Sequence, residues 1–174
     1  MTAPEAGTTT YPPLTAPPIS LIALTPELAD SAVKGRLNAA PGWPEPPFRA
    51  LMAELSRLVA ADPSVGALTR LITLPDSSNP QGWRVIGDVG VRFDAPRSDQ
   101  EAEIGYSITR NFRGRGFGSR AVLIFCQYLL DQGYTALRAR TEDGNDPSER
   151  VLEKIGFALV SRHDGLGDWI YRKR

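Results

Sequence analysis

The chain has 174 residues, a length typical of one domain, and hydrophobic residues make up 41% of it, which is enough to build a core. Lys plus Arg and Asp plus Glu both number 20, so the net charge is zero, and we expect no binding of nucleic acid through a general positive charge. One cysteine excludes an internal disulfide and zinc sites built from several cysteines, and we expect no metal.

The N-terminal residues predict an extended tail ahead of the domain. Residues 1–18 are rich in proline and threonine, and we expect residues 19–174 to form the single domain. The start has no basic region followed by an apolar core, as a signal peptide would have. No run approaches the ~18 apolar residues of a membrane span. We therefore expect a cytoplasmic protein that does not contact a membrane.

The next residues predict one strand and two helices. An apolar run is typical of a strand, and Thr25 followed by Pro26 is typical of a helix start. Four prolines and a glycine then predict a loop, after which apolar residues recur at helical spacing. The predicted elements are a strand at 19–24, a helix at 26–37, a loop at 38–47 and a helix at 48–59.

Residues 67–109 predict three antiparallel strands. Apolar residues alternate with polar ones through two of the three segments, as they do when one face of a sheet is buried. The segment 75–82 is dense in proline, glycine, serine and asparagine, which are typical of turns. A second loop is predicted at 94–100.

The remaining residues change to a helical spacing. Apolar residues after Phe117 predict a long helix that ends near Gly133. Asp146 is the expected N-cap of a shorter helix, with Pro147 at its first position and Glu149 completing a capping box. The predicted elements are helices at 117–133 and 147–155 and strands at 136–141, 157–162 and 168–173. This order of elements describes a mixed α/β domain.

A glycine-rich turn, Arg-Gly-Arg-Gly-Phe-Gly at 113–118, lies between a strand and the long helix. Glycines allow a positive φ and a close approach of the backbone, and N–H groups at a helix start bind phosphate. Arg113, Arg115 and Arg120 add positive charge. The turn lacks the Gly-Lys-Ser/Thr of a Walker loop, and antiparallel strands do not suit a Rossmann unit. Taken alone, the turn is either an anion site or a plain structural turn.

Two motifs together resemble a known family. Arg-x-x-Gly-x-Gly at 113–118 resembles the Gln/Arg-x-x-Gly-x-Gly/Ala motif of the GNAT superfamily of N-acetyltransferases, and Asn-x-x-Ser at 145–148 resembles its second signature. Residues 103–108 resemble the RimJ/RimL-like branch. The resemblance implies an α/β (α+β) fold with a mixed, mostly antiparallel sheet of six to seven strands. About four helices and a split after the fourth strand, predicted at 102–109, are also implied.

The resemblance also implies how acetyl-CoA, the cosubstrate, is held. Backbone N–H groups of the glycine turn would bind the pyrophosphate, while the backbone of Ile108 and the side chain of Asn145 would bond the pantetheine arm. The implied cofactor-binding residues are Ile108, Arg113, Gly114, Arg115, Gly116, Phe117, Gly118, Ser119 and Asn145.

The reaction implied is direct attack of a neutral primary amine on the thioester. An ammonium has no lone pair, so a base must first take its proton. Glu103 alternates away from apolar Ile104 and lies where some family members carry their base, so it is the expected base. An ordinary solvated glutamate is the alternative.

The sequence departs from the family at one position. Many GNAT enzymes carry a tyrosine seven positions after the asparagine, where it can protonate the leaving thiolate, but Leu152 stands there. Ser148 would instead donate a hydrogen bond to the thiolate, or bulk water would protonate it. The missing tyrosine leaves open a second function, a non-catalytic acyl-CoA-binding sensor or regulatory module.

The acceptor amine, a protein N-terminus or a small molecule, is not fixed by the motifs. Trp43 and Phe48 flank the loop that forms a wall of the acceptor groove in GNAT folds, so with Glu103 they are the expected substrate contacts, unless they only pack together. Acids near the groove are few (Glu45, Glu103 and Asp88), which disfavours a polycationic aminoglycoside. Because homodimers are common in the family that the chain resembles, the resemblance suggests a homodimer.

Two reactive side chains are interpreted as structural. His163, the one histidine, adjoins a predicted turn, and Cys126 falls within the long helix without a histidine placed to activate it.

Overall fold

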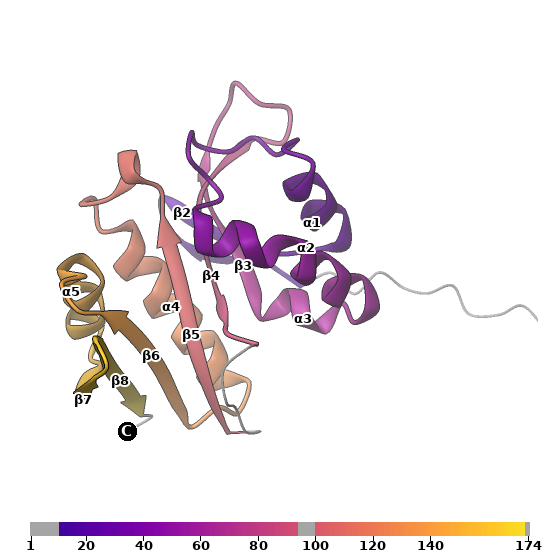
Figure 1. Cartoon of the computed structure of the whole chain (residues 1–174). Helices are drawn as coiled ribbons and strands as arrows, with labels where there is room; N and C mark the ends of the chain where they lie inside the picture. The colour runs from indigo at the N-terminus through magenta and orange to yellow at the C-terminus, as the bar shows by residue number, and fades with distance from the viewer. Residues whose placement is uncertain (1–10, 94–99, 173–174) are drawn as a thin grey trace, which may run out of the picture.

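Eight β-strands form one sheet through the described residues, 11–93 and 100–172, of this computed structural model (Figure 1). They are β1 (Leu14–Ala16), β2 (Ile19–Ala23), β3 (Thr69–Pro75), β4 (Trp83–Val91), β5 (Glu101–Ile108), β6 (Ala136–Glu142), β7 (Ala158–His163) and β8 (Leu166–Arg172). The order across the sheet is β1-β2-β3-β4-β5-β6-β8-β7. Neighbours are antiparallel except for β5 and β6, which are parallel.

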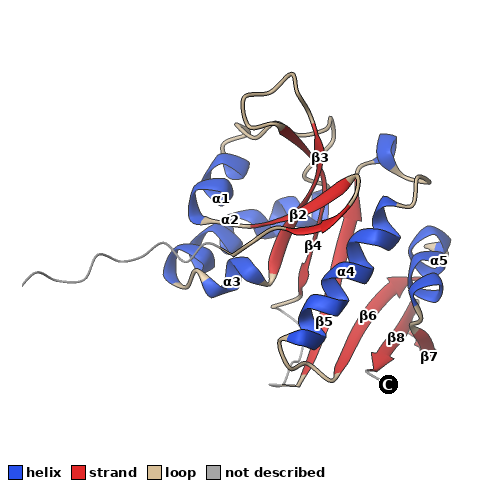
Figure 2. Ribbon diagram, turned by 180° about the vertical axis from the view of Figure 1, so that it is seen from behind, coloured by secondary structure: helices blue, strands red, loops and turns tan. Residues whose placement is uncertain are grey.

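Helices cover both faces of the sheet (Figure 2). They are α1 (Pro26–Val33), α2 (Pro46–Ala61), α3 (Ser64–Ala67), α4 (Phe117–Asp131), α5 (Asp146–Ile155) and a short 3-10 helix, η1 (Arg110–Phe112). Neighbouring strand residues enter different cores: Leu71 packs toward α1 and α2, and Ile72 packs toward α4. This alternation follows from the two-residue period of a strand, and it fixes the sheet between two apolar layers.

The sheet opens between β5 and β6. The two strands pair only over Glu101–Glu103 and Ala136–Arg138. Beyond these residues β5 stays paired with β4, and β6 stays paired with β8 as far as Glu142. The two strands therefore separate toward their carboxyl ends, which lie on the same side because the strands are parallel. The predicted split after the strand at 102–109 is confirmed.

The structure has more elements than the sequence predicts. Within the described residues there are eight strands rather than six to seven, and five α-helices rather than about four. The helix that the sequence did not predict is the four-residue α3. The strand that it did not predict is β1, which lies inside the predicted tail and pairs with β2. Residues 1–10 of that tail, and residues 94–99 of a predicted loop, lie outside the described part.

The described end of the tail contacts buried Arg70 of β3. Arg70 Nη1 donates to the carbonyl of Pro12 at 3.0 Å, and the guanidinium lies 4.6 Å from the centre of the Tyr128 ring. Arg70 is 1% exposed, and its burial lowers its pKa. The segment at 11–18 thus lies along the sheet, whereas an extended tail was predicted.

Two helix boundaries differ from the prediction. The first helix ends at Val33 rather than near residue 37, because Gly35 adopts a φ of +64° just after it. The second helix begins at Pro46, inside the predicted loop, because proline suits a first turn whose N–H groups have no helical partner.

The cap of α5 was predicted wrongly. Asn145, not Asp146, is the N-cap, and its Oδ1 accepts a hydrogen bond from the Ser148 N–H at 3.4 Å. Glu149 completes no capping box, because its carboxylate accepts hydrogen bonds from Arg162. The predicted C-terminal glycine, Gly156, is confirmed with a φ of +98°.

Candidate active site

A cleft of about 1260 Å³ lies where β5 and β6 separate. Its walls come from β4, β5, the first turn of α4, the start of α5, and α2 with α3. A pocket for one small ligand usually measures ~300–1,000 Å³, so this cleft has room for two substrates side by side. The side of α4 and α5 is called the cofactor half below, and the side of α2 and α3 the acceptor half.

The glycine turn faces the cofactor half with open backbone. Gly114 and Gly116 have φ values of +73° and +78°, which favour glycine, and Gly116 is the N-cap of α4. Among the described residues no side chain caps α4, so its first N–H groups are not blocked by a cap. A Cβ added at Gly118 would meet only Ile108 and Val151 side chains, at 3.6 and 3.8 Å. These features suit a phosphate.

Arg113 joins the two halves of the cleft. Its Nε donates to the carbonyl of Ile108 at 2.7 Å, and its Nη2 forms an ion pair with Glu45, the N-cap residue of α2. Arg113 lines the cleft, as do most of the predicted cofactor residues. Arg115 does not; its guanidinium lies 5.6 Å from the centre of the Phe112 ring.

The start of α5 forms the opposite wall of the cofactor half. Asn145 and Ser148 both line the cleft there, and the Asn145 side chain already serves as the helix cap. Tyr106 of β5 reaches across the opening, and its hydroxyl donates to the Ser148 carbonyl at 3.0 Å. Burial raises the pKa of Tyr106 to about 12, so the phenol keeps its proton.

A buried carboxylate, Asp88, lies on the floor of the cleft. Asp88 pairs in register with Ser107, is 5% exposed, and lines the cleft. Its Oδ2 accepts hydrogen bonds from Ser107 Oγ at 2.7 Å and from Trp43 Nε1 at 3.0 Å. Burial raises the pKa of Asp88 to about 7, although both hydrogen bonds lower it. A carboxyl poised near neutrality in a cleft is a candidate general base.

The sequence named Asp88 as a nearby acid but not as a base. The available signal was an aspartate inside the strand Trp-Arg-Val-Ile-Gly-Asp-Val-Gly-Val, where the flanking positions are apolar. An ionisable residue in a buried strand is costly and therefore often has a function.

Glu103, the predicted base, lies beside the closed end of the split. Its Oε2 accepts hydrogen bonds from Arg140 Nε at 3.0 Å and from Arg140 Nη2 at 2.7 Å. Arg140 lines the cleft, whereas Glu103 is not among the lining residues. The catalytic role of Glu103 stays a prediction.

Trp43 and Phe48, predicted as acceptor contacts together with Glu103, lie in different places. Phe48 lines the cleft, while Trp43 is 8% exposed and lies behind the floor, where it holds Asp88. Their ring centroids are 6.0 Å apart within the apolar layer under α1 and α2. Phe48 therefore lies at the surface of the cleft, and Trp43 lies behind it as a hydrogen-bond donor to Asp88.

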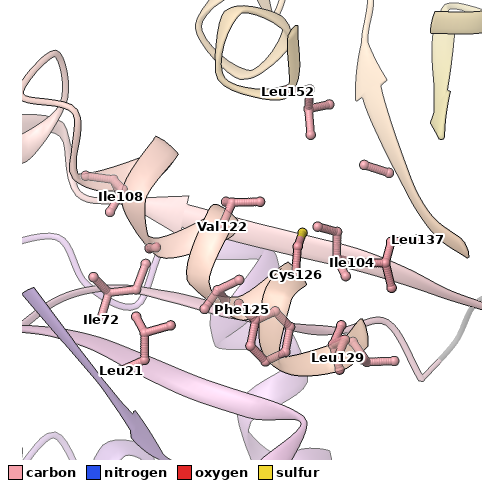
Figure 3. Close-up of a cluster of buried hydrophobic side chains, with 14 of the residues drawn as sticks. Leu21, Ile72, Ile104, Ile108, Val122, Phe125, Cys126, Leu129, Leu137 and Leu152 are labelled. Atoms are coloured by element: carbon pink, nitrogen blue, oxygen red, sulfur yellow. The ribbon is translucent and has the colours of Figure 1, made fainter. Parts of the chain in front are cut away.

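Three residues singled out from the sequence lie away from the cleft. Leu152 is fully buried and points into the core cluster with Val122 and Cys126 (Figure 3). Burial raises the pKa of the Cys126 thiol to about 12, which agrees with a packing role. His163 has a side chain that is 57% exposed and lies 3.3 Å from Asp168.

Neither a metal cluster nor a membrane span is found in residues 11–93 and 100–172. No three His, Cys, Asp or Glu side chains come together in a way that could hold a metal ion. No helix in that range is both long and apolar enough to cross a membrane.

Comparisons with known proteins agree with this geometry. A family described as an acetyltransferase (GNAT) domain matches residues 27–158. The uncharacterized N-acetyltransferase p20 of Bacillus licheniformis is 38% identical over 78 residues, which is 42% of this chain and 41% of that protein. The chain spans between 41% and 53% of the length of the three curated relatives it matches.

Solved structures share the fold at low sequence identity. RimL, a ribosomal L7/L12 alpha-N-protein acetyltransferase in complex with coenzyme A, has a TM-score of 0.65 at 13% identity, covering 92% of this chain and 98% of that one. The ribosomal-protein-S5-alanine acetyltransferase of Vibrio fischeri has a TM-score of 0.62 at 14% identity, covering 93% and 97%. Both agree in fold with the predicted RimJ/RimL-like resemblance.

Burial of Asp88 predicts an unusual dependence of stability on pH. A carboxyl whose folded pKa is raised from 3.8 to about 7 favours the folded state below 3.8, and that contribution is lost as pH rises through about 7. The loss is on the order of 4 kcal/mol. We expect wild type to lose unfolding free energy relative to Asp88→Asn between pH 4 and 8, measured by urea denaturation.

The control for this measurement is Asp131→Asn, which changes an exposed aspartate of α4. It should follow wild type across the same range. Parallel curves for wild type and Asp88→Asn would show that the Asp88 pKa is not raised in the folded protein.

Proposed function

The chain belongs to the GNAT family of acetyltransferases, and we propose that it is an N-acetyltransferase that moves acetyl from acetyl-CoA directly to a primary amine. The main observation that supports this proposal is that the open glycine turn and the buried carboxylate Asp88 face the same cleft. The turn suits a phosphate, and the carboxylate suits the removal of a proton from an amine.

In this proposal acetyl-CoA lies in the cofactor half. Backbone N–H groups of residues 113–119 hold its pyrophosphate, and Ile108 and Asn145 hold the pantetheine arm. The Ile108 carbonyl accepts from Arg113 Nε at 2.7 Å, and its second lone pair can accept a hydrogen bond from the arm. No metal takes part.

The proposed reaction is a single transfer. The ammonium loses one proton to a carboxylate, the neutral nitrogen bonds to the thioester carbonyl carbon, and the carbon–sulfur bond breaks. The nitrogen loses a second proton as the amide forms, and the coenzyme A thiolate takes up one proton, so the products are an N-acetyl amine and coenzyme A. Cys126 is too deeply buried to carry the acetyl group as an intermediate.

Two carboxylates are candidates for the base, and Asp88 is supported better than Glu103. Asp88 lines the cleft beside the part of β5 that leaves β6, and the described structure gives it no cationic partner. Glu103 is already bound by Arg140 outside the lining of the cleft. We therefore assign proton removal to Asp88, and to Glu103 the positioning of Arg140.

Ser148 remains the proposed donor of a hydrogen bond to the leaving thiolate. It lines the cofactor half at the start of α5, and its hydroxyl lies in the first turn of a helix, whose dipole also favours an anion. Many family members have a tyrosine at the position of Leu152. The leucine side chain has no hydroxyl and is buried in the core, so it cannot take the place of that tyrosine.

The second candidate function is a non-catalytic acyl-CoA-binding sensor or regulatory module. The buried Leu152 in place of a tyrosine is the observation that favours it. Cytoplasmic location and a homodimer stay predictions.

The proposed function is tested by binding and by turnover. We expect acetyl-CoA to bind by calorimetry, and a panel of primary amines to release free thiol with formation of the N-acetyl product. Binding without thiol release for every amine would favour the sensor. A lack of acetyl-CoA binding would rule out both the transferase and the acyl-CoA-binding module.

Substituting each carboxylate separates the two candidate bases. Asp88→Asn should lower kcat/KM by about 10²–10⁴-fold and remove the rise of kcat/KM with pH near 7, because it removes the base. Glu103→Gln should cost less and keep that rise. The assignment is reversed if Glu103→Gln, rather than Asp88→Asn, abolishes the pH dependence.

The role of Ser148 is tested by Ser148→Ala. We expect kcat to fall by about 10–100-fold, since one hydrogen bond to a charged group contributes ~1.5–3 kcal/mol, with an unchanged Kd for acetyl-CoA. Single-turnover kinetics would measure the chemical step directly. Wild-type turnover in this variant would remove Ser148 from the mechanism.

A further inference from the structure

The acceptor half of the cleft has an apolar wall on α2. Phe48, Leu51, Leu55 and Leu58 recur three and four residues apart, so they lie along one side of the helix, and all four line the cleft. Leu51 is 36% exposed, whereas Leu55 is buried. Leu51 is the one cleft-lining residue among the exposed large hydrophobic residues of the described chain. An apolar surface inside a cleft suits an apolar ligand group.

The sheet opposite this wall carries a pair of glycines. Gly90 and Gly105 pair directly between β4 and β5, and both line the cleft. A Cβ at Gly105 would meet Arg92 Cδ at 3.1 Å, and a Cβ at Gly90 would meet the Leu68 carbonyl oxygen at 3.0 Å. The glycine pair therefore lets the backbone at Leu68 and the aliphatic part of Arg92 approach the sheet closely, and Arg92 lines the cleft opposite α2.

The acids at the rim of the acceptor half already have partners. Glu45 is paired with Arg113, Glu54 with Arg57, and Asp62 accepts a hydrogen bond from the Ser64 N–H at 2.9 Å. Asp88 differs from Glu45 and Glu54, because its partners in the described structure are the neutral donors Trp43 and Ser107, and it differs from exposed Asp62 because it is buried. The inner end of the acceptor half therefore offers a carboxylate to one cationic group of a ligand. It does not offer carboxylates to several cationic groups.

We propose that the acceptor is a monoamine whose primary amino group is attached close to a bulky apolar group. Its amino group lies beside Asp88, and its apolar body lies on Phe48, Leu51 and Leu58, between α2 and the aliphatic part of Arg92. This inference rests on the proposed transferase function. The same chemistry occurs in a free arylalkylamine and in a peptide whose first residue is large and apolar.

The test compares acceptors with wild-type enzyme and acetyl-CoA. The free amines are 2-phenylethylamine, 1,4-diaminobutane and an aminoglycoside, and the peptides differ only in a first residue of Leu or Asp. We expect kcat/KM to be about tenfold or more higher for 2-phenylethylamine than for the polycations, and likewise for the Leu peptide over the Asp peptide. The better of the two apolar acceptors identifies the source of the amine.

A matched pair of variants locates the apolar contact. Leu51→Gln should lower kcat/KM for the apolar acceptor by about tenfold through KM, while the Kd for acetyl-CoA and the melting temperature stay at wild-type values. Leu123→Gln changes another exposed leucine, on α4 and outside the cleft, and should leave all these quantities unchanged.

The outcomes separate this inference from the function on which it rests. Acetylation that favours the polycations or the Asp peptide, or a preference for apolar acceptors that Leu51→Gln leaves intact, overturns the inference and leaves the transferase in place. Binding of acetyl-CoA without acetylation of any acceptor overturns the transferase itself.

Discussion

The short parallel pairing of β5 with β6 is the constraint on which the cleft depends. Three residues on each strand pair at Glu101–Glu103 and Ala136–Arg138, and the strands then part. From Ile104 onward the backbone groups of β5 that would face β6 have no strand partner. Buried backbone groups need hydrogen bonds, and here a side chain supplies one, since Arg113 Nε donates to the Ile108 carbonyl. A longer pairing would satisfy these groups and remove the cleft.

Asp88 shows what the site costs the fold. A carboxylate at 5% exposure without a cationic partner disfavours the folded state once it ionises. The hydrogen bonds from Ser107 and Trp43 offset part of that cost, but the pKa of Asp88 still stays raised, at about 7. A cationic partner at the same place would stabilise the protein and would leave a weaker base. For Asp88 as the proposed base, the requirements of stability and of proton transfer oppose each other.

The sequence predicted well the features that depend on neighbouring residues. The meander, the long helix after Phe117, the glycine turn and the split follow from local periodicity, turn residues and the family motifs. The errors also have local causes. Asn145 and Asp146 are both good caps, so the pattern could not choose between them, and prolines at 46–47 suit a helix start as well as a loop.

The two halves of the cleft differ in how they are built, and this explains which of them the sequence could predict. The cofactor half consists mostly of backbone groups from a glycine turn and a helix start. Both lie within the six consecutive residues 113–118. The acceptor half needs Trp43, Asp88 and Ser107, which are far apart in the chain and meet only through the register of β4 with β5 and the packing of α2. Glu103 fits the local pattern of a base, but the neighbouring β6 supplies Arg140 to its carboxylate. The proposed proton chemistry therefore depends on tertiary contacts, whereas the proposed phosphate binding depends on local sequence.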